Sequence, residues 1–344
     1  MGVVPVRHQR TPAPSSVSPV VEAWATYRTG NGAQWSAADL ARAKRDTRVS
    51  VVIPARDEAA TVGAIVSAIR RDLAEQVCLV DEIVVVDSRS SDATAEVARA
   101  AGARVVSQDE VTRGLPRMEG KGDALWAGLY ASTGDLVAFV DGDLRDFTAG
   151  FVTGLLGPLL SDSSVEFVKG FYHRPLIGES GVEADGGGRV TELAARPLIN
   201  LFWPELAGFV QPLAGEYAGR RSTLERIPFV SGYGVEIAML IDLLDLVGLD
   251  ALAQVDLGER FHRHQGTEAL GRMSAQIMVT AWSRLHRRGL VADPLPPSTL
   301  LTQFRRGGTG DLPHLDREIV VHDAAVDERP ALATVSRPAA APAP

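Results

Sequence analysis

Four short runs of β-branched and apolar residues, separated by helical segments, constrain the fold of this chain more than any other feature. The runs occupy residues 48–54, 82–87, 104–107 and 136–140. After the first run, apolar side chains recur at intervals of three and four residues, as on one face of a helix: Val62, Ile65, Val66, Ile69 and Leu73. Such strands alternating with helices are typical of a mostly parallel sheet covered on both faces. We therefore predict a Rossmann-like α/β fold with a central sheet flanked by helices.

Polar segments follow three of these runs, at residues 54–58, 87–88 and 141–143. In open α/β sheets, ligands bind outside the carboxyl ends of the strands, so these segments mark the expected site. Asp141 and Asp143 are two residues apart and can share one face of an extended chain. A hard divalent cation accepts such carboxylate ligands, and the cation can hold a diphosphate. The pattern therefore indicates nucleotide-sugar chemistry.

Each acidic residue at this edge suggests a particular contact. Glu58 can accept hydrogen bonds from ribose hydroxyls or from the uracil imide. Asp87 can read the uracil edge, with Ser88 beside it. We expect Asp141 to contact the sugar or the ribose and Asp143 to bind the metal ion.

Three basic features complete the expected site. Lys121 lies between two glycines ahead of a predicted helix, where it can neutralise phosphate. Gly188, Arg189 and Thr191 follow further glycines at a predicted helix start and can form an anion cradle. His262, within the basic cluster at residues 260–264, is the candidate second metal ligand.

Composition excludes several classes of protein. The 344 residues carry 35 basic and 43 acidic side chains, a net charge of −8, which argues against general binding of nucleic acid or anionic membranes. The single Cys78 excludes an intrachain disulfide framework and a multi-cysteine zinc site, and its apolar neighbours suggest a buried thiol. No apolar run reaches the roughly 20 residues that span a bilayer, so we expect a cytoplasmic protein without membrane insertion. The first strand lacks a dinucleotide-binding glycine fingerprint, and no Walker A motif is present.

The organisation along the chain can be divided into six parts. We expect disordered tails at 1–20 and 329–344, where Pro, Ser and Ala prevail. A helical N-terminal extension should cover 21–47 and a C-terminal extension 291–328. Residues 48–146 should form the nucleotide-sugar-binding half. Residues 147–290 should complete the sheet and bind the acceptor, with strands at 165–172 and 251–257 and helices at 189–202, 235–247 and 269–286.

The motifs of the first half resemble those of GT-A glycosyltransferases: Val-Val-Ile-Pro-Ala-Arg-Asp-Glu, Ile-Val-Val-Val-Asp-Ser, Gly-Lys-Gly-Asp-Ala-Leu-Trp and Phe-Val-Asp-Gly-Asp-Leu. Downstream segments are more specific: Gly-Arg-Val-Thr-Glu-Leu, Ala-Arg-Pro-Leu, Gln-Pro-Leu-Ala-Gly-Glu-Tyr and Tyr-Gly-Val-Glu. They resemble the glucosyl-3-phosphoglycerate synthase family, the retaining enzymes of glycosyltransferase family 81. The resemblance extends to about residue 290.

This resemblance implies a GT-A fold, UDP-glucose as donor, 3-phospho-D-glycerate as acceptor, a Mg²⁺ or Mn²⁺ ion, and a homodimer. It assigns contacts with UDP-glucose to Pro54, Ala55, Glu58, Ser88, Lys121 and Asp141. It assigns the metal to Asp143 and His262, and phosphoglycerate to Gly188, Arg189 and Thr191. The sugar pocket would contain Tyr233 and Glu236, and Arg260 would lie near the diphosphate. His264 occupies the acceptor-site position at which the family pattern has asparagine.

The retained configuration implies a mechanism. No carboxylate nucleophile emerges from the sequence, so we expect front-face substitution through an oxocarbenium-like state. Asp141, Asp143, Lys121 and Glu236 would carry the catalysis, with Lys121 and the metal stabilising the departing diphosphate.

Three alternatives remain open at this stage. A mannosyl-3-phosphoglycerate synthase, or another retaining transferase, would share the fold and differ in donor or acceptor. A nucleotidyltransferase would share the sheet and the metal carboxylates, but it normally carries a Gly-rich basic loop where residues 54–58 stand. A catalytically silent sugar-binding protein would not need the full set of Lys121, Asp141, Asp143 and His262.

Overall fold

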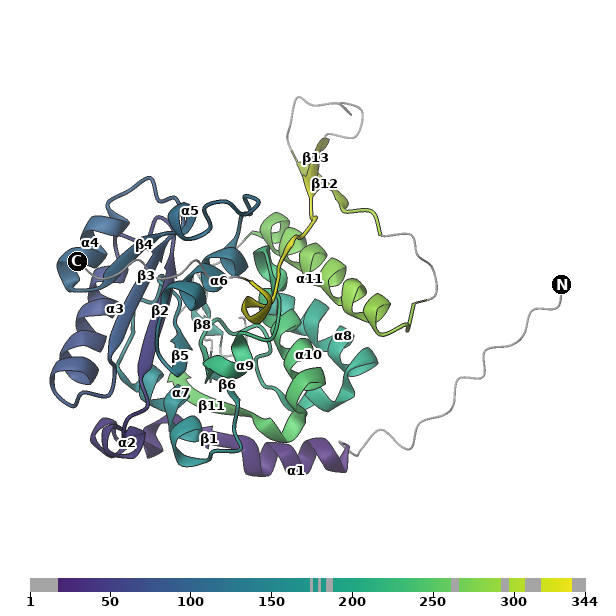
Figure 1. Cartoon of the computed structure of the whole chain (residues 1–344). Coiled ribbons are helices and arrows are strands. Elements are labelled where there is room, and N and C mark those ends of the chain that lie inside the picture. The colour runs from purple at the N-terminus through teal and green to yellow at the C-terminus, as the bar shows by residue number, and fades with distance from the viewer. Residues whose placement is uncertain are drawn as a thin grey trace.

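The protein is built around one eight-stranded sheet, seen in a computed structural model that describes residues 18–173, 176–178, 181–183, 188–260, 266–291, 297–306 and 317–335 (Figure 1). The strand order is β1-β11-β6-β9-β5-β2-β3-β4. In that order the strands are Thr29–Asn31, Leu252–Glu259, Phe167–His173, Tyr217–Arg220, Leu136–Phe139, Val49–Ala55, Glu82–Asp87 and Arg104–Ser107. The four strands predicted in the first half are confirmed as β2, β3, β4 and β5.

The sheet is mostly parallel, as predicted. In the described sheet, β9 alone runs against its neighbours, pairing antiparallel with both β5 and β6. This insertion brings the segment before Tyr217 to the carboxyl end of β5, close to the turn that contains Asp141. The fold class expected from the sequence is therefore confirmed, and the antiparallel strand positions part of the site.

Helices cover both faces of the sheet. The α-helices are α1 (Pro19–Arg28), α2 (Ala37–Lys44), α3 (Val62–Ile69), α4 (Thr94–Ala101), α5 (Gln108–Val111), α6 (Lys121–Ala131), α7 (Gly150–Ser161), α8 (Arg196–Phe202), α9 (Arg221–Leu224), α10 (Val235–Val247) and α11 (Thr267–Arg287). A π-helix extends α3 over Arg70–Glu75, and another precedes α8 at Thr191–Ala195. Short 3₁₀ helices lie at Gly32–Gln34, Pro204–Gly208, Gly232–Gly234, Leu249–Ala251 and Leu332–Thr334.

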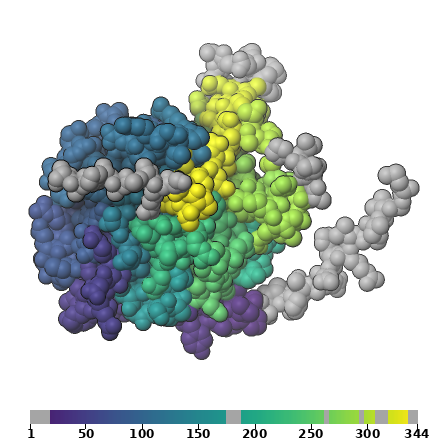
Figure 2. Space-filling view, in the orientation of Figure 1, coloured from purple at the N-terminus to yellow at the C-terminus, as the bar shows by residue number. Residues whose placement is uncertain are grey.

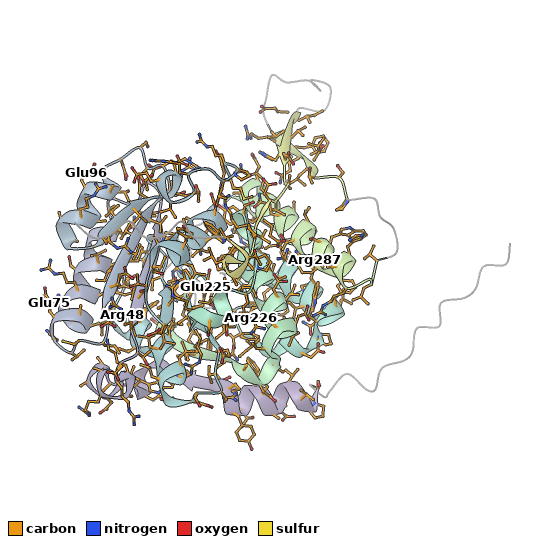
Figure 3. The ribbon with its side chains drawn as sticks, viewed as in Figure 1. Arg48, Glu75, Glu96, Glu225, Arg226 and Arg287 are labelled. Atoms are coloured by element: carbon orange, nitrogen blue, oxygen red, sulfur yellow. The ribbon has the colours of Figure 1, made fainter. Side chains whose placement is uncertain are left out.

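Alternate residues of strand β2 pack into two separate cores. Val51 and Ile53 lie in the core beneath α3 and α7, whereas Val52 lies in the core formed with α6, α10 and α11. This division follows from the period-two alternation of a strand buried on both faces. Charged side chains such as the labelled Glu75 and Glu96 lie on the outer surface (Figure 3).

The N-terminal extension differs from the prediction. Residues 19 and 20 begin α1 instead of belonging to a tail. The segment expected to be helical also contains β1, which pairs in parallel with β11 and adds an edge strand to the sheet. Cys78 is exposed, contrary to expectation, because it lies in a turn with a positive φ of 56° after the π-helix.

The C-terminal segment leaves the body of the molecule and returns to it. Strands β12 (Leu300–Arg306) and β13 (Arg317–Asp323) form an antiparallel hairpin that projects from the body (Figure 1). Strand β14 (Glu328–Arg329) then pairs with β10 (Phe229–Val230). A separate antiparallel pair joins β7 (Leu176–Gly178) to β8 (Gly181–Glu183).

Residues 329–335, which were predicted to belong to a disordered tail, are part of the fold. Arg329 is 1% exposed and Leu332 is 3% exposed, and both are packed in the fold. The yellow C-terminal segment lies against the rest of the molecule (Figure 2). Composition alone missed this because a buried arginine is held by a specific partner that lies far away in the sequence. No helix in the described residues is long and apolar enough to cross a membrane.

Candidate active site

The polar segments that were predicted to form the site lie at the carboxyl ends of β2, β3 and β5. The turn at residues 141–143 packs on the end of β2, since a Cβ added to Gly142 would lie 3.0 Å from the carbonyl oxygen of Pro54. The hydroxyl of Thr61 donates to the carbonyl oxygen of Gly142 over 2.7 Å. The backbone amide of Ser88 donates to the carbonyl of Ala55 over 2.8 Å. Three segments that are distant in the sequence thus meet at one edge.

Glu58, Asp141 and Asp143 gather at this edge, and the pKa values of Glu58 and Asp143 are raised. Partial burial and the charge of Asp143 raise the pKa of Glu58. Partial removal from water and the charge of Asp141 raise the pKa of Asp143, although Arg260 opposes the shift. Bringing a divalent cation among these acids would relieve their repulsion. Among the described residues, no group of three or more His, Cys, Asp or Glu side chains has the geometry of a metal site.

Lys121 joins two of the predicted catalytic acids. Its ammonium lies 2.6 Å from Oδ1 of Asp141 and 3.0 Å from Oε1 of Glu236. Lys121 begins α6 and Glu236 lies in the first turn of α10, so the pair connects the two predicted halves. Burial opposes ionisation, but the two carboxylates raise the pKa of Lys121 well above its ordinary value. The ammonium is therefore fixed in the charged form.

Two glycines allow this close packing. Gly120 has a positive φ of 105°, and a Cβ there would lie 2.5 Å from the backbone nitrogen of Gly232. A Cβ on Gly215 would lie 2.5 Å from the Lys121 ammonium and would overlap Oδ2 of Asp141. The absence of a side chain at Gly215 is thus a condition for the Lys121–Asp141 ion pair.

Arg260 is the second cationic centre. Its guanidinium lies 2.9 Å from Oδ1 of Asp143 and 2.6 Å from Oε1 of Glu216, and it donates to the hydroxyl of Tyr172 over 2.7 Å. Asp141 is 3.6 Å away. Arg260 therefore lies against the acid that was predicted to bind the metal. Sequence reasoning assigned no role to Tyr172 or Glu216, although Glu216 belongs to a segment that carries the family resemblance.

A buried lysine beneath the site was also missed. Lys169 and Tyr217 face each other across β6 and β9, and the Lys169 ammonium is 4.5 Å from the centre of the Tyr217 ring. Neither the Lys169 ammonium nor the Tyr217 hydroxyl has a hydrogen-bond partner among the described residues. Burial lowers the pKa of Lys169 to about 7, although the nearby Glu236 opposes this. A lysine inside an otherwise apolar strand was the available signal.

The predicted uridine contacts lie at the end of β3. Oδ1 of Asp87 accepts from the backbone amide of Ser90 over 3.2 Å. The hydroxyl of Ser88 donates to Oε1 of Gln108 over 2.5 Å. Both residues are next to Ala55, which pairs with Asp87 in register. The structure therefore brings the predicted donor-site segments together.

The predicted sugar and acceptor residues are described less completely. Tyr233 is 46% exposed, in the 3₁₀ turn that leads into α10 and Glu236. Gly188 has a positive φ of 78°, Arg189 is exposed, and Thr191 is buried at the start of the π-helix. His262 and His264 lie outside the described residues. The roles expected of these six residues stay predictions.

Comparisons with known proteins agree with this geometry. The family model "Glycosyl transferase family 2" matches residues 50–174. The chain is similar to "Glucosyl-3-phosphoglycerate synthase" of Mycolicibacterium smegmatis, with 50% identity over 261 residues that cover 76% of this chain and 85% of the relative. The corresponding protein of Mycobacterium tuberculosis H37Rv is 47% identical over 281 residues, covering 80% of this chain and 83% of the relative.

Two solved structures are similar over almost the whole chain. Glucosyl-3-phosphoglycerate synthase from Mycobacterium tuberculosis, in complex with Mn²⁺, UDP and phosphoglyceric acid, superposes with a TM-score of 0.74 and 41% identity, covering 87% of this chain and 95% of that one. Mannosyl-3-phosphoglycerate synthase from Rubrobacter xylanophilus superposes with a TM-score of 0.83 and 42% identity, covering 92% and 98%.

Proposed function

The chain belongs to the glucosyl-3-phosphoglycerate synthase family, and on that premise we propose that it transfers glucose from UDP-glucose to 3-phospho-D-glycerate with retention of the anomeric configuration. The observation that carries the proposal is the partly buried ion-pair cluster in which Lys121 joins Asp141 and Glu236, beside Asp143 and Arg260. It lies at the carboxyl edge of the sheet, where α/β proteins bind their ligands.

The donor nucleotide would lie against the ends of β2 and β3. Pro54 and Ala55 would contact it through the backbone. The carboxylates of Glu58 and Asp87 would accept hydrogen bonds from the uridine, and the Ser88 hydroxyl would also hydrogen-bond to it. These residues are adjacent in the fold. The raised pKa of Glu58 leaves its carboxyl sensitive to the charges that arrive with the donor.

The residues present fit a divalent cation. The acid cluster supplies hard oxygen ligands and mutual repulsion that a cation removes. Asp143 and His262 would hold Mg²⁺ or Mn²⁺, with the donor diphosphate completing the shell. When bound, the ion neutralises charge on the diphosphate and so helps it depart.

The chain's own cations act on the same leaving group. Lys121 and Arg260, both fixed in the charged form, are positioned to offset the negative charge that develops on the β-phosphate. The bond between the glucose anomeric carbon and the phosphate oxygen breaks, and a bond to the acceptor hydroxyl oxygen forms on the same face. The proton of that hydroxyl passes to the departing phosphate oxygen. Asp141 and Glu236 hold Lys121, and Tyr233 and Glu236 would border the sugar.

The acceptor would bind next to this centre through its own anionic groups. Gly188 can offer a backbone amide, and Arg189 and Thr191 can offer a guanidinium and a hydroxyl to the phosphate and carboxylate of phosphoglycerate. His264 would complete this set. The segment lies at the start of the π-helix at Thr191–Ala195, where helical amides begin.

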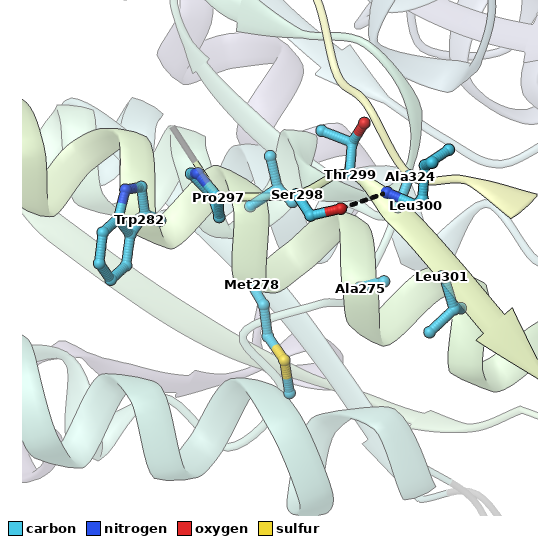
Figure 4. Close-up of a pocket in the computed structure, with 10 residues that line it drawn as sticks. Ala275, Met278, Trp282, Pro297, Ser298, Thr299, Leu300, Leu301 and Ala324 are labelled. Atoms are coloured by element: carbon cyan, nitrogen blue, oxygen red, sulfur yellow. Dashed lines mark hydrogen bonds between the residues drawn. The ribbon is translucent and has the colours of Figure 1, made fainter. Parts of the chain in front are cut away.

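We further propose that the protein is a cytoplasmic homodimer. Large apolar side chains are exposed on α11 and on the projecting hairpin, at Met278, Leu300, Phe304 and Val321. Between α11 and β12 lies a cavity of about 230 Å³ with a mainly apolar lining (Figure 4). Burying this surface against a second copy would remove it from water. Light scattering should give twice 36.7 kDa, and Phe304→Glu should yield monomers; a monomeric wild type would contradict the proposal.

The donor distinguishes this proposal from its main competitor. The similarity to mannosyl-3-phosphoglycerate synthase from Rubrobacter xylanophilus favours GDP-mannose as the alternative donor. Purified protein should be given phosphoglycerate, Mg²⁺ and either UDP-glucose or GDP-mannose, and the product should be identified by mass and by its anomeric configuration. We expect α-linked glucosyl-3-phosphoglycerate and UDP. Turnover of GDP-mannose alone would replace this function. The glucosylated product of the proposed reaction would feed methylglucose lipopolysaccharide or glucosylglycerate synthesis, as the family resemblance implies.

A further inference from the structure

The returning C-terminal segment, residues 324–335, crosses the molecule as a strap next to the donor site. Its strand β14 pairs with β10, and the backbone amide of Ser231 donates to the carbonyl of Asp327 over 2.8 Å. The indole nitrogen of Trp126 in α6 donates to the carbonyl of Pro330 over 2.9 Å. In Figure 1 the yellow segment runs from the hairpin back towards α6 and α10. This strap lies beyond residue 174, where the match to the glycosyltransferase family model ends.

Arg329 inserts from the strap into the interior. Its Nε atom lies 2.5 Å from Oδ1 of Asp123, and its guanidinium is 5.6 Å from the ring of Trp126. Arg329 is 1% exposed and Asp123 is fully buried. A buried ion pair is a poor source of stability, because the cost of removing two charges from water offsets their attraction. A further role would account for this pair.

Buried hydrogen bonds continue from this ion pair to the nucleotide edge. Nε2 of Gln108 donates to Oδ2 of Asp123 over 2.5 Å, and the hydroxyl of Ser88 donates to Oε1 of Gln108 over 2.5 Å. Gln108 is fully buried and Ser88 is 7% exposed. The orientation of the Ser88 hydroxyl is therefore set by a chain of contacts that starts at Arg329.

The same ion pair fixes the helix that carries Lys121. Asp123 lies in the first turn of α6, two residues after Lys121. Gly122 packs directly on the backbone of β10, because a Cβ there would overlap the carbonyl oxygen of Val230. The strap thus holds this turn from two sides, through the Arg329 side chain and through its pairing with β10.

We propose that Arg329 is a positioning residue of the donor site. It acts through Asp123 and Gln108 on the Ser88 hydroxyl, and through Asp123 on the first turn of α6. The inference rests on the proposed function, because it assigns the uridine and the diphosphate to Ser88 and Lys121. Arg329 does not touch the donor itself.

The strand β14 provides a matched control. Glu328, next to Arg329, points to α11, where it accepts from Arg284 over 2.5 Å and from Arg287, labelled in Figure 3, over 2.9 Å. Glu328→Gln weakens the attachment of the strap without touching the chain from Asp123 to Ser88. A strap that serves only stability would give the same phenotype for substitutions at both positions.

The test measures UDP binding by calorimetry with Mn²⁺ present, together with thermal unfolding and the KM for each substrate. Arg329→Met should raise the Kd for UDP and the KM for UDP-glucose about tenfold, with the KM for phosphoglycerate unchanged, and Arg329→Lys should restore part of the loss. Glu328→Gln should lower the Tm while the Kd stays within about twofold. Gln108→Met keeps the Arg329–Asp123 pair and should also raise the Kd for UDP, so it provides the test if Arg329→Met does not fold.

Two outcomes would overturn the inference. Folded Arg329→Met or Gln108→Met protein that binds UDP as tightly as the wild type would leave Arg329 a structural residue only. An equal loss of UDP affinity in Glu328→Gln would assign the effect to the strap as a whole. Failure of the proposed function differs from both, because the wild type itself would then bind no UDP and form no product.

Discussion

Replacing Gly215 by alanine should damage the active site with a change of one methyl group. The new Cβ would lie 2.5 Å from the Lys121 ammonium and would overlap a carboxylate oxygen of Asp141. Real Cβ atoms keep more than 3 Å from such neighbours. Lys121 or Asp141 must therefore move, and their 2.6 Å ion pair cannot persist unchanged.

The size of the effect follows from a displacement of about 1 Å. At an effective dielectric constant of roughly 20, lengthening a charge separation from about 2.6 to 3.6 Å weakens the interaction by roughly 2 kcal/mol. The same displacement of Lys121 relative to a donor phosphate oxygen would raise the barrier by a similar amount. This corresponds to a loss of roughly 30-fold in kcat/KM.

The assay compares Gly215→Ala with Gly150→Ala under saturating metal. Gly150 lies at the exposed start of α7, and its new Cβ would meet only the hydroxyl of Thr148 at 3.2 Å. We expect the loss of kcat/KM in Gly215→Ala alone, with both variants folded by circular dichroism. Activity of folded Gly215→Ala within threefold of the wild type would refute the reasoning, because the ion pair would then have no fixed position to disturb.

Three further predictions concern the metal, the acceptor and a buried lysine. Asp143→Ala should nearly abolish turnover while folding survives, and so should treatment of the wild type with EDTA. Addition of Mn²⁺ should restore the activity of the treated wild type but not that of the variant, and full activity of the variant would reject the assignment of Asp143 to the metal. Arg189→Ala should raise the KM for phosphoglycerate about tenfold or more and leave UDP binding unchanged, as measured by steady-state kinetics and calorimetry; a selective loss of UDP binding would contradict it. Burial lowers the pKa of Lys169 to about 7, so between pH 7 and 10 this side chain is less protonated in the folded chain than in the unfolded chain. The free energy of unfolding should therefore increase with pH in this range, by up to about 1.4 kcal/mol per pH unit. Lys169→Met should remove that slope from denaturant titrations at pH 7 to 9, and an unchanged slope would show that Lys169 is not the group that titrates.

Local patterns in the sequence were sufficient to predict the first half of the fold. The Val/Ile runs identified β2, β3, β4 and β5, and α10 spans the predicted residues 235–247. These elements are determined by short-range hydrophobic period, which a single sequence displays. The edge strand β1 was missed, because three residues without an apolar run become a strand only by pairing with β11.

Long-range pairings decided what the sequence could not predict. Arg329 was assigned to a tail because proline and alanine follow it, yet Asp123, 206 residues away, holds it in the interior. Burial of such a charge depends on a partner that no local window contains. Cys78 was missed for a different, local reason: its apolar neighbours suggested burial, but it lies in a turn with a positive φ, and the turn exposes it.

The composition of the site depends most of all on one strand direction. Because β9 enters antiparallel between β5 and β6, the chain before it arrives at the carboxyl ends of those parallel strands. Gly215 and Glu216 therefore meet Asp141, Lys121 and Arg260 there. A parallel β9 would carry that segment to the opposite edge of the sheet, leaving Arg260 without Glu216 and Lys121 without the space that Gly215 provides. The acids and the lysine can be read from their motifs, but their mutual placement follows from this reversal.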